Sequence, residues 1–389
     1  MYKKILSTVI PPSSTAASTE TLPMKTTTDS PSPSGGSYTD MFRRRNLTIT
    51  LLVGVVIGLP CLIYFNDMIP SQLLSLSFYD SSSNSIKVDA RLKEVLEKAA
   101  MKDKTVILTT LNEAWATPNS VFDLFLESFR IGERTQNLTS NLVIIALDGK
   151  AYKRCMEIHP HCYALTTSGI DFSEEAYFMS ADYLVMMWRR IDFLRTVLEM
   201  GYNFVFTDAD IMWFRNPFDF NRFYNGSDFQ IACDWYNGNS RDVNNSPNGG
   251  FTYVRSNERT KKFYKYWYEA RQSHPGKHDQ DVLNIIKHKR SFRNIGLKIR
   301  FLNTAYFGGL CEPSRNLNEV CTMHANCCFG LDNKLNDLNV MLNDWRRFMA
   351  LPEDSKKSWK KSWNVPQNCS LGNFHPHPSK KDAKQEKIV

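Results

Sequence analysis

A short apolar run that ends in two carboxylates constrains the fold of this chain more than any other stretch. Residues 204–206, Phe-Val-Phe, are typical of a buried strand, and Asp208 and Asp210 follow them one residue apart. Aspartates are poor strand formers, and in open α/β sheets ligands gather at the carboxyl ends of strands. Two hard oxygen ligands at such a place suit Mg²⁺ or Mn²⁺. The stretch therefore predicts a divalent-metal site at the edge of a sheet.

The positive charge of the chain is concentrated at its two ends. The formal net charge of the 389 residues is +8. Residues 1–45 carry six Lys and Arg against three acids, and residues 356–389 carry eight Lys against two acids. The body between these ends is therefore nearly neutral, which argues against a nucleic-acid-binding domain.

Residues 47–65 contain no charged side chain and are numerous enough to span a bilayer. Three arginines at 43–45 precede this run and only Asp67 follows closely, so the positive-inside rule places the N-terminus in the cytosol. A cleaved signal peptide would begin nearer the N-terminus and end at small residues. We therefore predict a single-pass signal anchor with the body in the secretory lumen. A buried core helix is the alternative.

One of the nine cysteines lies in the predicted span and eight lie beyond it. An even number in a lumenal compartment suggests disulfides, although the sequence does not fix their pairing. A zinc site at Cys327 and Cys328 would need about four Cys and His ligands at a repeated spacing, and no matching Cys pair is present. A lone imidazole, His324, could instead join two carboxylates on Mn²⁺. Four triplets beyond the span are glycosylation candidates, at Asn137, Asn225, Asn244 and Asn368.

Strand and helix patterns alternate in the first half of the body. Such alternation indicates βαβ units and a mainly parallel sheet, hence an α/β fold. Strands are expected at 105–110, 142–147, 162–165 and 204–206, and helices at 120–131, 150–159 and from the cap Ser180 to Gly201. The second half is less regular: strands are expected at 229–233, 251–255 and 298–302, a polar loop at 237–250, and helices at 258–271 and 281–289.

The chain is predicted to consist of five parts in order. These are a disordered cytosolic tail (1–46), the transmembrane signal anchor (47–65), a serine-rich stem (66–88), a single catalytic domain (89–351) and a basic, poorly packed C-terminal tail (352–389).

Two further polar motifs have both a structural and a functional interpretation. Asn248-Gly249-Gly250 precedes an expected strand, and its glycines permit either a hairpin-type turn or a close approach of backbone to a ligand. Arg215, after the acidic pair, could face a phosphate, but a surface position is favoured.

His278, Asp279, Gln280 and Asp281 open an expected helix. Acids in a first helical turn are ordinary partners of the helix dipole, and this interpretation is favoured. The same acids are also placed to orient an acceptor hydroxyl.

No P-loop, dinucleotide-binding glycine motif or nucleophile-elbow motif occurs in the chain, so ATPase, dinucleotide oxidoreductase and α/β-hydrolase activities lack their main signatures. Four separated motifs instead resemble the plant nucleotide-diphospho-sugar transferase family, which is related to glycosyltransferase family 77. They lie at 206–218, 248–251, 278–284 and 321–328, within a resemblance that covers about 105–348.

This resemblance implies a GT-A fold, a Rossmann-like single domain behind an N-terminal transmembrane helix, in a Golgi type II membrane protein. It implies retaining transfer of a pentose or hexose from a UDP-sugar to a cell-wall polysaccharide or glycoprotein acceptor. The expected cofactor is Mn²⁺ or Mg²⁺, which bridges the donor diphosphate to Asp208 and Asp210.

The resemblance also implies roles for individual residues. The more distant glycosyltransferase family 8 shares the Asp-Gln-Asp segment, in which the glutamine, here Gln280, lies near the anomeric carbon. That family also has a late metal-binding histidine and a diphosphate-binding lysine. His324 and Lys334 follow in the same order, at longer intervals than in family 8. An arginine on the helix before the acidic pair contacts the donor in those relatives, and Arg189 or Arg190 occupies that region here. The expected sets are catalytic Asp279, Gln280 and Asp281; donor-binding Thr109, Thr110, Arg190, Asp208 and Lys334; sugar-pocket Asn248, Gly249 and Gly250; and metal-binding Asp208, Asp210 and His324.

Two other classes of function remain open from the sequence. One is a non-catalytic relative that binds glycans or scaffolds other transferases, and the intact acidic pair counts against it. The other is a metal-dependent phosphohydrolase, which would need further metal ligands.

Overall fold

The computed structural model describes residues 89–165, 172–173 and 179–369. All of them belong to the second of two compact units, which spans Ser85–Val389. The predicted cytosolic tail, membrane span and stem lie outside the described residues. Within the described ranges no helix has the length and apolar content that a bilayer requires.

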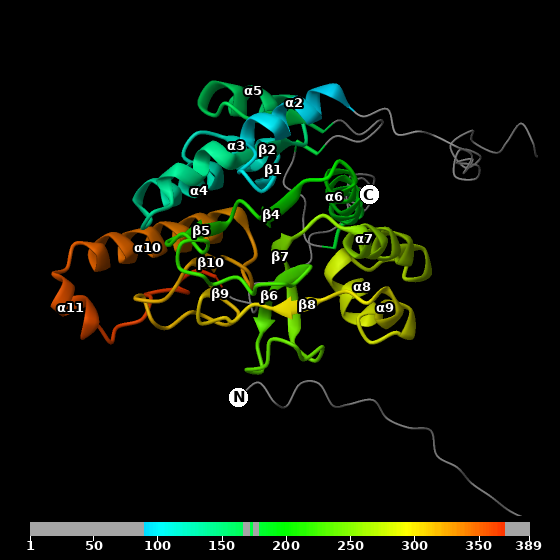
Figure 1. Ribbon diagram of the computed structural model, residues 1–389. Helices are drawn as coiled ribbons and strands as arrows, with labels where there is room; N and C mark the ends of the chain where they lie inside the picture. The colour runs from blue at the N-terminus through cyan, green and yellow to red at the C-terminus, as the bar shows by residue number, and fades with distance from the viewer. Residues whose placement is uncertain (1–88, 166–171, 174–178, 370–389) are drawn as a thin grey trace, which may run out of the picture. The chain divides into compact units, whose positions relative to one another are not determined.

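A seven-stranded sheet forms the centre of the body, in the order β3-β2-β1-β4-β7-β6-β8 (Figure 1). Every neighbouring pair is parallel except the two that involve β7, which runs antiparallel to β4 and to β6. The predicted α/β class and mainly parallel sheet are therefore confirmed, with one reversed strand. The strands are β1 Thr105–Leu111, β2 Leu142–Ala146, β3 Cys162–Ala164, β4 Asn203–Thr207, β6 Phe229–Trp235, β7 Ser246–Val254 and β8 Ile299–Phe301.

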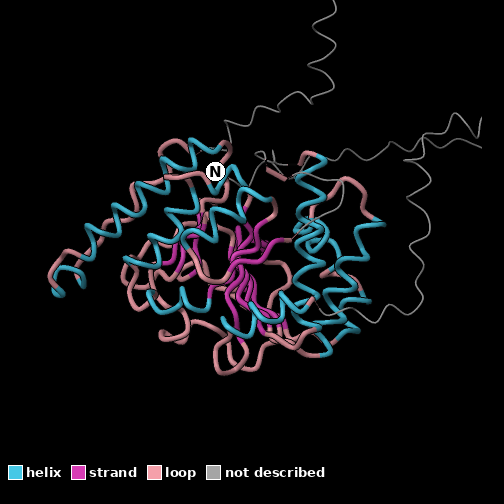
Figure 2. The backbone as a smooth tube through the Cα atoms, turned by 90° about the horizontal axis from the view of Figure 1, so that it is seen from above, coloured by secondary structure: helices cyan, strands magenta, loops and turns pink. Residues whose placement is uncertain are grey.

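Helices cover both faces of this sheet, as the view in Figure 2 shows. Alternate side chains of β4 enter two separate cores: Val205 packs with α4 and α10, whereas Phe204 and Phe206 pack with α6 and α7. The helices are α2 Ala90–Ala99, α3 Glu113–Ala116, α4 Val121–Ile131, α5 Gly149–Ile158, α6 Ala181–Glu199, α7 Glu258–Ala270, α8 Asp279–Ile286, α9 Arg290–Ile295, α10 Leu331–Met349 and α11 Glu353–Lys357, with 3₁₀ turns at Gln136–Asn141 and Arg271–Ser273.

A second sheet joins distant parts of the sequence beside the acidic pair. It has the order β5-β10-β9, formed by Ile211–Trp213, Thr322–His324 and Phe307–Gly309. The antiparallel register of β10 and β5 places His324 opposite Ile211. A residue more than a hundred positions away in sequence is thereby brought next to Asp210.

The polar stretch before residue 251 is shorter as a loop than the sequence predicted. β7 begins at Ser246, so Asn248, Gly249 and Gly250 belong to the strand and not to the loop. The reason is pairing: Ala232 and Cys233 of β6 oppose Asn248 and Pro247. Partners across a sheet thus override the turn preference of Asn and Gly.

The prediction of a poorly packed tail from 352 is wrong for residues 352–369. Trp363 is buried and its ring lies 5.0 Å from that of Phe214. The Asp337 carboxylate accepts the backbone N–H groups of residues 367–369 at 3.0 Å, and Cys369 forms a disulfide with Cys328. One aromatic anchor, one carboxylate and one disulfide therefore extend the body along a lysine-rich segment.

Three disulfides are present in the described residues, Cys155–Cys162, Cys311–Cys327 and Cys328–Cys369, while Cys233 and Cys321 are buried thiols. Adjacent cysteines 327 and 328 therefore belong to two different bridges and not to a zinc site.

The favoured surface position of Arg215 is wrong. Arg215 is buried, it pairs with Glu133 at 2.8 Å, and it donates to the Val320 carbonyl.

Candidate active site

The carboxyl ends of β4 and β6 meet at one edge of the sheet, because both strands run antiparallel to β7 between them. Asp208 follows β4, Asp234 lies near the end of β6, and Asn248 lies near the start of β7. This is the edge at which an open α/β sheet binds its ligands.

Four side chains form what we call the acidic cluster: Asp208, Asp210, His324 and Lys334. His324 Nε2 lies 3.2 Å from Asp210 Oδ1 and 4.0 Å from Asp208 Oδ2. Lys334 Nζ, from the first turn of α10, donates to Asp210 Oδ2 at 2.5 Å. The structure brings together the four residues that the sequence analysis assigned to metal and donor binding, and their roles stay predictions.

The electrostatics of the two aspartates differ. Burial opposes the charge of Asp210, but Lys334 and His324 outweigh it and hold the pKa of this carboxyl below its ordinary value. Burial raises the pKa of Asp208. The charge of Arg190 offsets this rise only in part, and the neighbouring Asp210 adds to it. Burial lowers the pKa of His324, but the charges of Asp210 and Asp208 and the hydrogen bond to Asp210 together outweigh it, so the pKa is raised above its ordinary value. Each carboxylate of the cluster is therefore paired with at least one cationic side chain.

The acidic cluster fits a divalent cation. Asp210 Oδ1 is buried and has no well-oriented hydrogen-bond donor among the described residues, even though His324 is near. One ligand atom each from Asp208, Asp210 and His324 lies within 4.8 Å of the others. A Cβ added to Gly250 would stand 2.6 Å from both Asp208 Oδ2 and His324 Cε1, so glycine keeps this space open. Two carboxylates and an imidazole suit Mn²⁺ or Mg²⁺.

Arg190, on α6, links the acidic cluster to α8. Its guanidinium donates to Asp208 Oδ1 at 2.9 Å and to Asp279 Oδ2 at 2.8 Å, and it lies over the Phe206 ring. Burial opposes the charge of Asp279, but Arg190 and His278 hold the pKa of this carboxyl below its usual range. Of the two candidate arginines, Arg190 faces the site, whereas Arg189 pairs with Asp192 at 3.4 Å.

The first turn of α8 separates its three candidate residues. Asp279 is buried against Arg190, while Gln280 Nε2 donates to Asp234 Oδ2 at 2.8 Å. Asp281 points elsewhere: its side chain is 43% exposed and its carboxylate lies 3.5 Å from His278 Nε2. Successive side chains of a helix point about 100° apart, so neighbouring residues of this motif face different parts of the structure. The structure thus brings Asp279 and Gln280, but not Asp281, toward the acidic cluster.

A bulge in β7 explains the two glycines. Ile231 of β6 pairs with Thr252, and the next residue, Ala232, pairs with Asn248, so the residues between them on β7 bulge from the ladder. Gly250 accepts a hydrogen bond from the Asp208 N–H at 2.7 Å. The hairpin-turn interpretation of this motif is wrong, because both glycines lie within β7, and the close approach of backbone to a ligand stays a prediction.

Thr109 and Thr110 end up at the carboxyl end of β1, beside β4. Thr109 is buried, and its hydroxyl has no hydrogen-bond partner among the described residues. Among the described residues, no hydrogen bond joins either threonine to the acidic cluster, so their donor-binding role stays a prediction.

Two residues of the site escaped the sequence analysis. Asp234 accepts hydrogen bonds from Asn248 at 2.8 Å and from Asn326 at 2.7 Å, in addition to Gln280. We call Asp234 and these three amides the amide cluster. Asp234 follows an apolar strand run, the same signal that identified Asp208, and could have been found by it. Nothing in the local sequence singles out Asn326.

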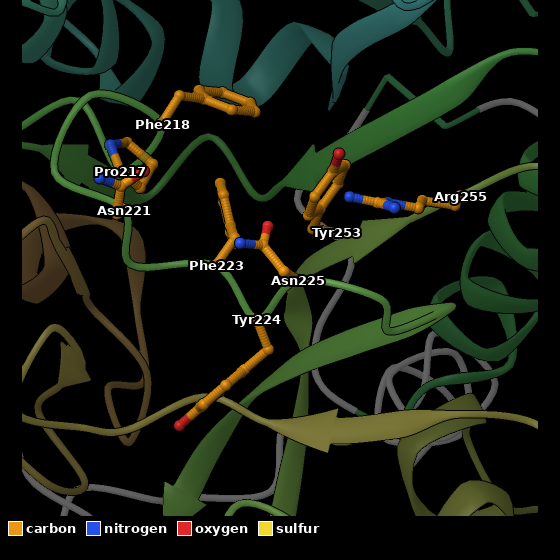
Figure 3. Close-up of a pocket in the computed structure, with 8 residues that line it drawn as sticks. All are labelled: Pro217, Phe218, Asn221, Phe223, Tyr224, Asn225, Tyr253 and Arg255. Carbon is orange, nitrogen blue, oxygen red and sulfur yellow. The ribbon is translucent and has the colours of Figure 1, made fainter.

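The pocket drawn in Figure 3 is a different feature. Its volume is about 120 Å³. The segment after β5 lines one side, and Tyr253 of β7 and Arg255, just after β7, line the other. Tyr253 pairs with Val205 in the middle of β4, and none of the lining residues belongs to the acidic or amide cluster.

Comparison with known proteins assigns the chain to a family. The family model described as nucleotide-diphospho-sugar transferase matches residues 137–338, which include both aspartates, the glycine bulge, the α8 motif and the late histidine and lysine. The chain belongs to the nucleotide-diphospho-sugar transferase family. The predicted glycosyltransferase class is thereby confirmed, and family and mixed α/β sheet together agree with the expected GT-A-like fold.

Several known proteins are similar to this chain. An uncharacterized Arabidopsis thaliana protein is 51% identical over 280 residues, which are 72% of this chain and 73% of the relative. The Arabidopsis thaliana UDP-D-xylose:L-fucose alpha-1,3-D-xylosyltransferase 3 is 27% identical over 336 residues, 78% of this chain and 84% of the relative. Among solved structures, mouse xyloside xylosyltransferase 1 is 14% identical with a TM-score of 0.37, covering 57% of this chain and 98% of its own.

Proposed function

We propose that this nucleotide-sugar transferase is a metal-dependent, retaining enzyme of the Golgi that moves a sugar from a UDP-sugar to a glycan or glycoprotein acceptor. The observation that carries the proposal is the acidic cluster at the ligand-binding edge of the sheet. Among the residues that the structure describes, its buried Asp210 oxygen has no well-oriented donor, and two carboxylates and an imidazole surround the same space.

Asp208, Asp210 and His324 would hold Mn²⁺ or Mg²⁺. When bound, the ion would act as a Lewis acid toward the donor diphosphate. Lys334 and Arg190 place two further cations at the same edge, where negative charge develops as UDP departs.

The donor sugar would lie against the glycine bulge and the first turn of α8, which are in direct contact with each other. Gly249 faces Asp279 and Arg190, with room for ordinary contact only, so the backbone forms one wall of the space. Asp279, kept ionised by Arg190, is an acceptor for sugar hydroxyls, and Gln280 is the side chain proposed near the anomeric carbon. The departing phosphate would take the proton of the acceptor hydroxyl.

The test is UDP release by the purified full-length chain in detergent, with a panel of UDP-sugars, with Mn²⁺ and with EDTA. UDP-xylose is the first donor to try, because a relative acts on it. We expect slow, Mn²⁺-dependent hydrolysis of one donor. No release and no Mn²⁺-dependent UDP binding would contradict the proposal.

The remaining parts of the proposal need separate measurements. Retention is tested by the anomeric configuration of the product in NMR, and an inverted product would exclude it. Golgi residence with a lumenal body is tested by co-localisation and protease protection of a tagged chain; the charge pattern around residues 47–65 supports it.

A further inference from the structure

Three side-chain amides connect to Asp234 in the same way. Each amide oxygen accepts one backbone N–H, and each amide NH₂ donates to the Asp234 carboxylate. The backbone donors are Gly250 to Asn248 at 2.9 Å, Gly249 to Gln280 at 3.0 Å and Cys311 to Asn326 at 3.2 Å. The three amides come from β7, from α8 and from the segment after β10, so one carboxylate ties together three walls of the site.

This pattern determines how each amide is turned. A backbone N–H can only donate and a carboxylate can only accept, so an amide between them has one orientation that satisfies both. For Gln280, the oxygen must face Gly249 and the nitrogen must face Asp234. Hydrogen bonds linked in series also strengthen one another in a low-dielectric site.

The position of Asp234 in the strand supports a dedicated role. Cys233 pairs with Pro247 and Trp235 pairs with Ser246, so Asp234 is the extra residue of a bulge in β6. Bulges are enriched next to active sites, where they redirect a side chain. Asp234 is redirected toward the amides and away from the ladder.

We propose that Asp234 is a positioning residue for sugar transfer: it fixes the orientation of the Gln280 carboxamide. The inference rests on the proposed function, since it concerns the same site. Asp234 is not suited to be the proton acceptor. A carboxylate offers about four hydrogen-bonding positions, and three are already used.

Asp234→Asn is the informative change, because it keeps size and loses one acceptor. If the new oxygen serves Asn248 and Asn326, the new NH₂ faces the NH₂ of Gln280. If Gln280 then turns over, its NH₂ faces the Gly249 N–H. One of the linked hydrogen bonds is therefore lost in either orientation.

The experiment is a double-mutant cycle with Asp234→Asn, Gln280→Ala and the double variant of the full chain, measured as UDP release with the preferred donor. We expect kcat to fall about tenfold or more in Asp234→Asn, with the donor KM within about twofold, since a hydrogen bond to a charged group is lost but diphosphate contacts remain. In the Gln280→Ala background, the same change should alter kcat by less than about twofold, because Asp234 acts through Gln280. Asp219→Asn, an exposed aspartate outside both clusters, is the matched control and should behave as the wild type.

Each outcome is decisive. Equal losses from Asp234→Asn in both backgrounds, or a fall in Tm that accounts for the lost activity, would overturn the positioning role while leaving the proposed function intact. If Asp234→Asn does not fold, Asp234→Glu replaces it: a longer carboxylate should fold and still misplace Gln280, with the same dependence on the background. A wild-type chain that turns over no donor would overturn the proposed function and this inference together.

Discussion

The acidic cluster and the amide cluster lie at the same edge of the sheet but use their oxygens differently. In the amide cluster every side-chain amide has a donor on one side and an acceptor on the other, and Asp234 takes three hydrogen bonds. In the acidic cluster, Asp210 Oδ1 is buried and no described residue offers it a well-oriented donor, while His324 and Lys334 lie close to its carboxylate. An unsatisfied buried oxygen is costly unless a ligand completes it. The comparison teaches that one cluster is arranged to bind and the other to hold its neighbours in place.

The largest effect is expected from Asp210→Asn, which tests the binding side of this comparison. The change removes a charged ligand and leaves Lys334 without its full ionic partner. We expect UDP release to fall by about 100-fold or more, as for loss of a group that stabilises developing charge. Isothermal titration with Mn²⁺ and UDP should show weakened binding in parallel. Mn²⁺-dependent activity equal to that of the Asp219→Asn control would show that Asp210 is no ligand.

A smaller loss is expected from Gly250→Ala, where the two clusters meet. The added Cβ would stand 2.6 Å from Asp208 and His324, and 2.9 Å from Asn248 Oδ1. One cluster or the other must shift, so we expect activity to fall about tenfold and the Mn²⁺ requirement to rise. Gly149→Ala, with no atom within 4 Å of the new Cβ, is the control. Unchanged Mn²⁺ dependence in Gly250→Ala would mean that the space kept open by this glycine is not a metal site.

The smallest effect is expected on folding stability, from Lys287, which contacts the loop that leads into the glycine bulge. Lys287, on the turn after α8, donates to the Asn245 carbonyl in the loop between β6 and β7. Burial lowers the pKa of Lys287 to about 8 from an ordinary 10.5, despite opposing contributions from Cys233 and Asp242.

Between these two pKa values the unfolded chain binds a proton that the folded chain does not, so folding stability should rise with pH from about 8 to about 10.5. Below pH 8 both states are protonated and this gain is absent. From pH 7 to pH 9.5 we expect the wild type to gain about 1–2 kcal/mol of unfolding free energy relative to Lys287→Gln, measured by urea denaturation. Parallel pH profiles of the two proteins would exclude a depressed lysine.

Much of the fold follows from local patterns. Neighbouring residues set both ends of α6. The Ser180 hydroxyl accepts the Tyr183 N–H at its start, and Gly201, at φ +85°, follows its end. The apolar run of β4 is likewise a local pattern. The acid pair after a buried strand was enough to predict the edge at which the site forms. Arg190 and Lys334 came from family resemblance, and the structure places both beside the aspartates.

The sequence by itself determined the alternation of the main strands and helices between residues 105 and 207, the position of the acidic pair and the family, because periodicity, caps and motifs are properties of neighbouring residues. The strands of the second sheet and helix α10 were not predicted. Only the tertiary structure decided which distant groups meet. Asn326 reaches Asp234 across the fold, Arg215 is buried against Glu133, and Trp363 anchors a segment that is otherwise rich in lysine. Such contacts depend on strand register, bulges and disulfides that join residues tens to hundreds of positions apart, and no local preference specifies them.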